Sequence, residues 1–413
     1  MSAALSLDGL FRRAGVRNAD ALALADPPHR ARFTDSAPRR LTYAQADRAI
    51  SAFAATLRGL GLSTGTVVGL HLPNTVESVV ALLGTIRAGM VAAPLPLLWR
   101  RQEMTEALGR AGAKAIVTAA RIGGCAHAEL AMEVAAGLFP VRQIAAFGDA
   151  LPDGVVPLDG IFTSTASEPP PAARASDAPV ALTFASAAEG IVTVPHGQAR
   201  LLEAGVALTE AMALAPDAPI LSTIPMTSFA GLAAALMPWL IAGGALELHQ
   251  GFDAEAFAAQ TAALTGGAVV LPGPALPALA GLVPRATRIV ALWRGPLGAD
   301  AAFPHVVDCV GRDEAAVTAA RRGNDGRPDP SVVEAAGRIA APGMVAVGAY
   351  QFRHAALDAL VSATDPDAMI AALPDGLLGN RLAGRAGDAA RVATALTARG
   401  ASPLVAGAFR ARH

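Results

Sequence analysis

The stretch Leu41–Leu98 decides the fold, and it reads LTYAQADRAISAFAATLRGLGLSTGTVVGLHLPNTVESVVALLGTIRAGMVAAPLPLL. Thr42 and Gln45 form a capping box, which is typical of a helix start. Apolar residues then recur at alternating steps of four and three, so they lie on one helical face. These residues are Ala46, Ile50, Phe53, Leu57 and Leu60. The pattern predicts a helix that ends at Gly59 and Gly61.

Strands and helices alternate through the rest of this stretch. Val67–Leu72 is a short apolar run suited to a buried strand, and Pro73 then opens a second helix with Glu77 in the capping-box position. Val91–Leu98 predicts another strand. Strands that alternate with helices of about 10 to 15 residues indicate crossover units and a parallel sheet with helices on both faces.

The same alternation continues beyond a polar, proline-rich break, with strands predicted at 180–184, 220–224, 268–271 and 288–293. We therefore predict an α/β fold of two layered α/β subdomains with largely parallel sheets, plus a small reduced α+β C-terminal module. The expected units are a large domain at 1–320 with subdomains at about 1–150 and 180–320, linkers at 151–179 and 321–342, and a C-terminal module at 343–413.

Charge and cysteine content exclude several classes of function. The 413 residues carry a formal net charge of -1. The chain therefore lacks the positive electrostatic field that would attract nucleic acid or an anionic membrane surface. Cys125 and Cys309 lie far apart, without the spacing of a disulfide framework or a zinc site. This cysteine content fits a cytoplasmic, reducing compartment.

One apolar segment has nearly the length of a membrane span. Phe229–Leu246 is uncharged, but Pro238 and the pair Gly243–Gly244 interrupt it, and half of it is alanine and glycine. We predict a buried helix that runs into a buried strand, and no membrane span.

Leu41–Leu98 resembles the opening of the adenylate-forming superfamily, the AMP-dependent synthetases that include the acyl-CoA synthetases. A helix after a tyrosine, a strand that ends in a proline–asparagine turn, and a strand of the form AGxVxxPL follow in the same order. The resemblance implies ATP-dependent activation of a carboxylic acid to an acyl-AMP and then to an acyl-CoA. The cofactors that it implies are ATP, Mg²⁺ and CoA.

The phosphate loop of that superfamily has the form TSGTTGxPKG, and its N–H groups and hydroxyls cradle ATP phosphates. Thr183–Gly197 stands at this position and reads TFASAAEGIVTVPHG. The resemblance assigns Ser186, Gly190 and Thr193 to a degenerate ATP site. Glu189, however, puts a carboxylate where the triphosphate would lie, and a like-charge contact at ~4 Å costs about 1 kcal/mol even in water.

The acyl-pocket motif PxxHxxG corresponds to Pro225–Gly231, which reads PMTSFAG. The resemblance places Ser228 and Gly231 in the substrate pocket, with Ser228 in place of the histidine.

The motif YGxTE corresponds to Val310–Glu314, which reads VGRDE. The resemblance assigns Gly311 and Glu314 to the ATP site and makes Glu314 the Mg²⁺ ligand. Val310 and Asp313 remove the stacking ring and the hydroxyl.

Two catalytic features of the superfamily are missing from the chain. No TGD motif follows Glu314, and Lys114, in the predicted strand AKAIVT, is the single lysine among 33 basic residues. A C-terminal lysine stabilises charge on the α-phosphate in this superfamily, and groups of this kind supply several kcal/mol. Val347–Phe352 resembles the hinge-proximal motif GGYR(I/F), with Gln351 in place of arginine.

Two single residues, Glu314 and His196, each allow a structural interpretation as well as a functional one. Glu314 is either a Mg²⁺ ligand or a solvated or helix-capping carboxylate, and the second, structural role is favoured. His196 is either a base or a hydrogen-bond donor to phosphate, or it is a surface or hydrogen-bonded polar group, and the second, structural role is favoured. No other catalytic constellation is present in the sequence.

Three hypotheses about function follow. The first is an acyl-CoA synthetase-like ligase that acts on a small-molecule carboxylate. The second is a non-catalytic descendant without these cofactors that binds an acyl ligand or a protein partner. Four losses favour it: the loop glycine, the stacking aromatic, the TGD aspartate and the catalytic lysine. The third is the product of a decaying gene, against which the intact helix caps argue.

Overall fold

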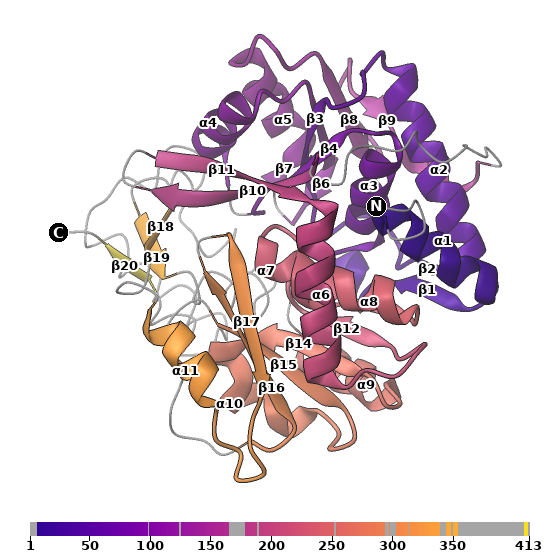
Figure 1. Ribbon diagram of the computed structural model, residues 1–413. Helices are drawn as coiled ribbons and strands as arrows, with labels where there is room; N and C mark the ends of the chain where they lie inside the picture. The colour runs from indigo at the N-terminus through magenta and orange to yellow at the C-terminus, as the bar shows by residue number, and fades with distance from the viewer. Residues whose placement is uncertain are drawn as a thin grey trace.

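The computed structural model describes residues 6–97, 99–123, 125–164, 178–187, 190–251, 253–293, 297, 303–312, 314–338, 344–347, 350–353 and 409–411. Within this part of the chain, the two large sheets contain seven and eight strands. Figure 1 shows the first sheet above the second, with helices between and around them. The predicted α/β fold with large, mostly parallel sheets is confirmed.

The first sheet takes most of its strands from one continuous region and ends in a hairpin. Its strands are β3 (Val67–His71), β4 (Val91–Pro94), β5 (Ala115–Ala119), β8 (Gln143–Phe147), β9 (Val156–Pro157), β10 (Pro179–Ala187) and β11 (Gly190–Gly197). Its connecting helices are α3 (Val76–Arg87), α4 (Arg101–Ala111) and α5 (His127–Ala136), with a small hairpin of β6 (Arg121–Ile122) and β7 (Cys125–Ala126) before α5. All pairs in this sheet are parallel except β10 with β11.

The order of this sheet, β11-β10-β4-β3-β5-β8-β9, contains a reversal. The chain moves from β3 through α3 to β4 on one side, and then returns through α4 to β5 on the other side of β3. Connections therefore leave this pair of strands in opposite directions. The edge beyond β3 and β5 is a topological switch point, where open α/β sheets bind ligands.

The second sheet joins an N-terminal pair of strands to a later block. Its strands are β1 (Leu22–Ala25), β2 (Arg40–Thr42), β12 (Ile220–Ser222), β13 (Leu246–Leu248), β14 (Ala268–Pro272), β15 (Arg288–Trp293), β16 (Val306–Arg312) and β17 (Ala316–Arg321). The helical elements that accompany it are α1 (Leu7–Arg17), η2 (Arg30–Arg32), α2 (Tyr43–Gly59), α6 (Gln198–Met212), α9 (Ala254–Ala263), η5 (Gly273–Ala275), α10 (Leu276–Leu279) and η6 (Ala280–Leu282). The strand order is β17-β16-β15-β14-β12-β13-β1-β2, with antiparallel strands only at the two ends.

The two sheets interleave along the chain, so the expected subdomain boundaries are wrong as a division of the sheets. Leu24 pairs with Leu246 in the second sheet, although 22–42 was expected in the first subdomain. Ala181 pairs with Ala92 in the first sheet, although 180–197 was expected in the second. Sequence periodicity identifies strands but does not show which strands pair, because pairing depends on backbone groups that every residue carries.

The apolar segment forms the predicted buried helix and strand. It contains α7 (Phe229–Gly231), a π-helical turn η4 (Leu232–Leu236) and α8 (Met237–Ala242), and it leads to β13. Trp239 is fully buried, and Gly243 ends the helix in the left-handed region with φ 81°. Within the described residues, no helix combines the length and the apolar character that a membrane span needs.

Both expected linkers contain ordered elements, which corrects the prediction. In 151–179, β9 and η3 (Asp159–Phe162) pack on the first sheet, while 165–177 lies outside the described residues. In 321–342, α11 (Pro330–Gly337) buries Val332 against the second sheet. Proline suggested a linker, but it is compatible with the first position of a helix, and Asp329 caps this one.

Most of the expected C-terminal module, 343–413, lies outside the described residues. The strands described there form an antiparallel sheet of three. They are β18 (Met344–Val347), β19 (Tyr350–Arg353) and β20 (Phe409–Ala411).

Helix starts give one confirmation and one correction. The capping box of Thr42 and Gln45 is present at the start of α2. Glu77 makes no capping box, because α3 begins at Val76 and its N-cap Thr75 makes no side-chain cap. The Glu77 carboxylate instead accepts from Arg30 and Arg39, at 2.7 and 2.9 Å.

Candidate functional site

The residues of the second and third motifs meet around the short helix α7. We define the α7 cluster as His196, Arg200, Ser228, Phe229 and Glu314. They come from the end of β11, the first turn of α6, the start of α7 and the turn after β16. In Figure 1, α7 lies near α6 in the middle of the molecule.

Glu314 is a buried helix cap. Its carboxylate accepts a hydrogen bond from the Phe229 backbone N–H at 2.6 Å, and the residue is 6% exposed. Its backbone lies in the left-handed region with φ 54°, which is costly for a residue other than glycine. The helix-capping interpretation is confirmed, and the solvated one is wrong, because the turn after β16 points the carboxylate at the start of α7.

Ser228 and Gly231 shape the same helix start. Ser228 is the N-cap of α7, and its hydroxyl accepts from the Gly231 N–H at 3.0 Å. A Cβ at position 231 would lie 2.5 Å from the Pro225 carbonyl oxygen, so only glycine fits there without a shift. The predicted substrate-pocket residues therefore serve the local turn.

Gly311 brings β16 against α7. A Cβ on Gly311 would lie 2.9 Å from the Ala230 Cβ, which is closer than such atoms normally approach. The absence of a side chain thus allows direct contact between strand and helix. The tertiary structure brings together four of the predicted site residues: Ser228, Gly231, Gly311 and Glu314.

His196 completes the cluster from β11. Its ring stacks on Phe229 with centroids 4.8 Å apart, and Nε2 shares a hydrogen bond of 2.7 Å with the Thr183 hydroxyl. Burial lowers the pKa of His196 to about 4, with Glu314 raising it and Arg200 lowering it. The imidazole is therefore neutral near pH 7, and it is a buried, hydrogen-bonded group rather than a surface one.

Arg200 is the residue that sequence reasoning missed. Its guanidinium carbon lies 5.4 Å from the centroid of the Phe229 ring, within the range of a cation–π contact, and its side chain donates to the Ala315 carbonyl oxygen. The exposed side chain sets a positive charge beside the cluster. Only its position in the first turn of the helix after the phosphate-loop region could have indicated it.

The segment expected to be a phosphate loop forms an antiparallel hairpin. Ser186 pairs with Ile191, and Thr193 pairs with Phe184. The ladder extends to the pair Ala187 and Gly190, and Glu189 lies outside the described residues. A phosphate cradle needs successive N–H groups that converge on one point, whereas a ladder directs them alternately to the partner strand and away from it.

These observations test whether the described residues fit ATP and Mg²⁺. The Glu314 carboxylate is committed to the start of α7, and the described part of Thr183–Gly197 is a paired hairpin. Among the described residues, no group of three or more His, Cys, Asp or Glu side chains could hold a metal ion. The described residues do not fit the nucleotide and its metal, so no chemical step is derived through them.

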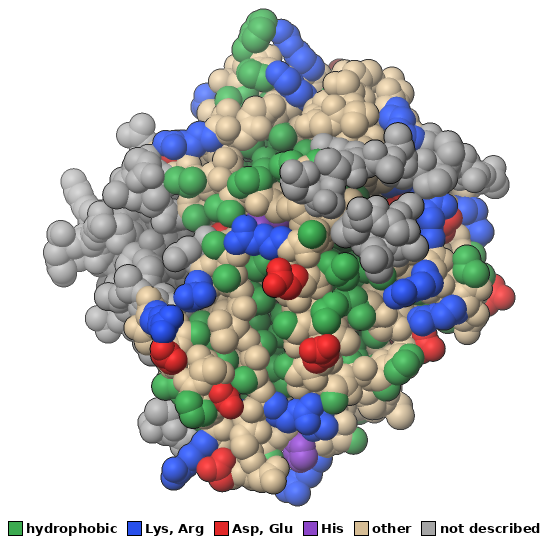
Figure 2. All heavy atoms as spheres, viewed as in Figure 1, with side chains coloured by type: hydrophobic (Ala, Val, Ile, Leu, Met, Phe, Trp, Pro, Cys, Tyr) green, Lys and Arg blue, Asp and Glu red, His purple; other side chains and the backbone are tan. Residues whose placement is uncertain are grey.

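Charges of both signs mix on the face of the molecule that Figure 1 shows. Figure 2 shows acidic and basic side chains interspersed across the face seen in Figure 1, among apolar and uncharged ones. This distribution agrees with the formal net charge of -1.

The AMP-binding enzyme family matches residues 11–270, which is more than half of the chain. The protein therefore belongs to the AMP-binding enzyme family, the adenylate-forming proteins that the motif order indicated.

Two curated relatives are CoA ligases. The chain is 29% identical over 202 residues to a sulfoacetate–CoA ligase of Cupriavidus necator, which covers 48% of the chain and 37% of the ligase. It is 27% identical over 226 residues to 4-coumarate–CoA ligase 1 of Narcissus pseudonarcissus, which covers 52% of the chain and 39% of the ligase. In each case the chain matches less than half of the relative's length.

Solved structures share the fold. MbtA from Mycobacterium smegmatis matches with a TM-score of 0.63 and 26% identity, over 76% of this chain and 58% of that one. An anthranilate–CoA ligase in complex with anthranoyl-AMP matches with a TM-score of 0.64 and 15% identity, over 77% of this chain and 62% of that one. The second likeness is one of fold alone.

Proposed function

We propose that this protein is a non-catalytic member of the AMP-binding enzyme family that binds a small acyl or carboxylate ligand beside the α7 cluster. One observation carries the proposal. The carboxylate that the motif order assigns to Mg²⁺ is buried and accepts from the Phe229 N–H at 2.6 Å. A buried carboxylate that leaves this position to bind a metal would leave the N–H without its partner, which costs about 1–3 kcal/mol.

The same cluster offers recognition of a carboxylate. Arg200 is exposed, and its guanidinium lies over the buried ring of Phe229, so a carboxylate head group can meet this cation at the surface of the cluster. Charge-assisted hydrogen bonds from a guanidinium to a carboxylate are roughly twice as strong as neutral ones. His196 is buried and neutral near pH 7, so it adds no competing charge beneath Arg200.

The second candidate is an active ligase that forms an acyl-AMP and then an acyl-CoA with ATP, Mg²⁺ and CoA. Family membership over residues 11–270 favours it, and so do the CoA ligases among the relatives. Under this candidate the hairpin and Glu314 would rearrange when nucleotide binds. A protein partner in place of an acyl ligand is a third outcome, which binding assays with small molecules separate from the first.

Calorimetric titration of the full chain decides between these candidates. We expect no heat with Mg-ATP at millimolar concentration, and measurable binding of hexanoate but not of hexanol. Arg200→Gln should weaken hexanoate binding at least fivefold, while the exposed Arg13→Gln on α1 should not. Micromolar binding of Mg-ATP, followed by release of AMP with any carboxylate, would reject the proposal in favour of the ligase.

A further inference from the structure

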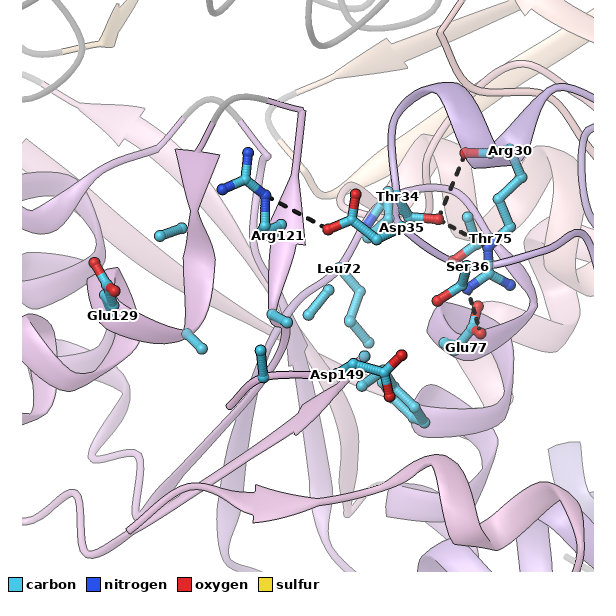
Figure 3. Close-up of a pocket in the computed structure, with 18 of the residues that line it drawn as sticks. Arg30, Thr34, Asp35, Ser36, Leu72, Thr75, Glu77, Arg121, Glu129 and Asp149 are labelled. Carbon is cyan, nitrogen blue, oxygen red and sulfur yellow. Dashed lines mark hydrogen bonds and ion pairs between the residues drawn. The ribbon is translucent and has the colours of Figure 1, made fainter. Parts of the chain in front are cut away.

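A cavity of about 310 Å³ lies in the first sheet's half of the molecule, built from residues outside the α7 cluster. Leu72, Ala119 and Phe147 line it, and they stand at the carboxyl ends of β3, β5 and β8. The starts of α3 and α5 flank these strand ends. Figure 3 shows the lining side chains around the opening. The volume is at the lower end of the range for small-molecule sites.

The position of this cavity follows from the strand order. It lies beyond β3 and β5, where the connections diverge and leave a crevice between neighbouring crossovers. Ligands of open α/β sheets bind in this crevice because loops from both sides converge there. We call it the switch-point pocket. The motifs of the adenylate-forming superfamily leave it without a role.

The rim of the switch-point pocket is acidic. Four carboxylates and two guanidinium groups line it, which gives a formal charge of -2. The six residues are Arg30, Asp35, Glu77, Arg121, Glu129 and Asp149. The floor is apolar, formed by alanines together with Leu72 and Phe147.

Both guanidinium groups are already paired. Arg30 is 3% exposed and bonds Asp26 at 2.5 Å and Glu77 at 2.7 Å. Arg121 pairs with Asp35 at 3.5 Å. These cations therefore neutralise their own partners and do not draw an anion into the pocket.

The remaining carboxylates carry the unbalanced charge. Glu129 and Asp149 line the pocket at its solvent-exposed edge, and the structure gives neither an ion pair with a described residue. In Figure 3, Glu129 lies at the left of the view and Asp149 near its centre, and no dashed line reaches either carboxylate. Glu77 is 2% exposed, and its Oε2 has no hydrogen-bond donor among the described residues, although its Oε1 has two. Arg30 and Arg39 balance the charge of Glu77, so its Oε2 offers the pocket an open acceptor atom rather than net charge.

We propose that the switch-point pocket binds a small organic cation, an aliphatic amine or diamine whose ammonium groups meet Glu129 and Asp149 and whose apolar stem lies over Leu72 and Phe147. A metal ion is disfavoured, because the described carboxylates do not gather into a metal-binding group. An anion is disfavoured by the charge of the rim. The inference is independent of the proposed function, since the α7 cluster shares no residue with this pocket.

A series of three probes with the same five-carbon chain tests the proposal on the full protein. Calorimetric titration with 1,5-diaminopentane, pentylamine and 1,5-pentanediol separates charge from shape. We expect the diamine to bind most tightly, the monoamine at least fivefold more weakly, and the neutral diol not to bind at millimolar concentration. Increasing salt should weaken the diamine most.

Paired variants locate the site. Glu129→Gln and Asp149→Asn should each weaken diamine binding at least fivefold. Glu133→Gln, on the exposed face of the same helix α5, and Asp153→Asn, in the exposed turn after the pocket, should leave it unchanged. Equal thermal unfolding of all four variants shows that folding is intact. Equal affinity for diamine and diol, tighter binding of inorganic phosphate, no binding by wild type, or unchanged binding in both pocket variants would each overturn the proposal.

Discussion

The α7 cluster and the switch-point pocket differ in what fills them. In the cluster, Glu314 and Ser228, which the motif order assigns to Mg²⁺ and substrate, accept hydrogen bonds from the backbone of α7, and His196 stacks on Phe229 beside them. In the pocket, the acidic residues Glu129 and Asp149 line a cavity of about 310 Å³. The order of the motifs indicates the family from which the protein descends. The shape and charge of a cavity indicate which class of ligand the present protein can bind.

The largest expected effect tests whether buried ion pairs hold the pocket wall. Arg30→Ala removes the cation that the buried Asp26 and Glu77 share and leaves only Arg39 beside Glu77, so we expect a loss of about 3–5 kcal/mol in the free energy of unfolding. Arg32→Ala breaks a largely exposed pair with Asp253 and should cost about 0–1 kcal/mol. Urea unfolding measures both. Similar losses for the two variants would mean that the wall does not depend on the buried pairs.

The next effect concerns the closed state of the α7 cluster. Glu314→Ala removes a buried acceptor from the Phe229 N–H, and we expect it to lower the free energy of unfolding by about 1–3 kcal/mol. Glu334→Ala, on the exposed face of α11, should change it by less than about 0.5 kcal/mol. The same denaturation curves, repeated with millimolar Mg²⁺, should not shift. Stabilisation of wild type by Mg²⁺ that Glu314→Ala abolishes would instead make this carboxylate a metal ligand.

Close contact between β16 and α7 gives a further test of the cluster. Gly311→Ala places a Cβ 2.9 Å from the Ala230 Cβ, so we expect overpacking to cost about 1–3 kcal/mol. Gly337→Ala is the matched control, because a Cβ there meets nothing within 4 Å and alanine favours the helix by up to about 1 kcal/mol. Thermal unfolding should separate the two variants. Equal melting temperatures would show that strand and helix are not tightly packed.

The smallest expected effect is a slope with pH from the buried imidazole of the cluster. The pKa of His196 is about 4 in the folded chain and ordinarily near 6.5, so between these values the unfolded chain binds the extra proton. The stability from the neutral ring is complete above about pH 6.5 and falls as pH decreases toward 4, by at most about 1.4 kcal/mol per pH unit.

A variant isolates this slope from the other titrating groups. Burial also lowers the pKa of His249 to about 4, which adds a slope of the same sign, and it raises the pKa of Asp26 to about 6, which adds one of opposite sign. The difference in unfolding free energy between wild type and His196→Phe, measured by urea titration from pH 7 to pH 4, removes both. This difference should shrink with decreasing pH. A difference that is constant with pH would place a charged or exposed ring at position 196.

The sequence predicted local structure well because local structure depends on neighbours along the chain. The spacing of Ala46, Ile50 and Phe53 gives one buried face of α2, and the capping box of Thr42 and Gln45 starts it where expected. The apolar run after Phe229 also formed the expected buried helix and strand. Prolines in 321–342 misled the prediction, since Pro330 begins a helix rather than a linker.

The motifs located the α7 cluster but not its chemistry. Ser228, Gly231, Gly311 and Glu314 were predicted and do come together, whereas Ser186, Gly190 and Thr193 lie in the hairpin ladder. A motif gives the residue type at a position, but the direction of a carboxylate depends on the turn that carries it.

The sequence by itself determined the family and the alternation of strands and helices, because periodicity and motif order are local patterns of residue type. Only the tertiary structure decided that Leu24 pairs with Leu246, that Glu314 reaches the Phe229 N–H 85 residues earlier, and that a cavity opens beyond β3 and β5. The physical reason is that these contacts join distant segments through backbone groups and strand order, which side-chain periodicity does not encode.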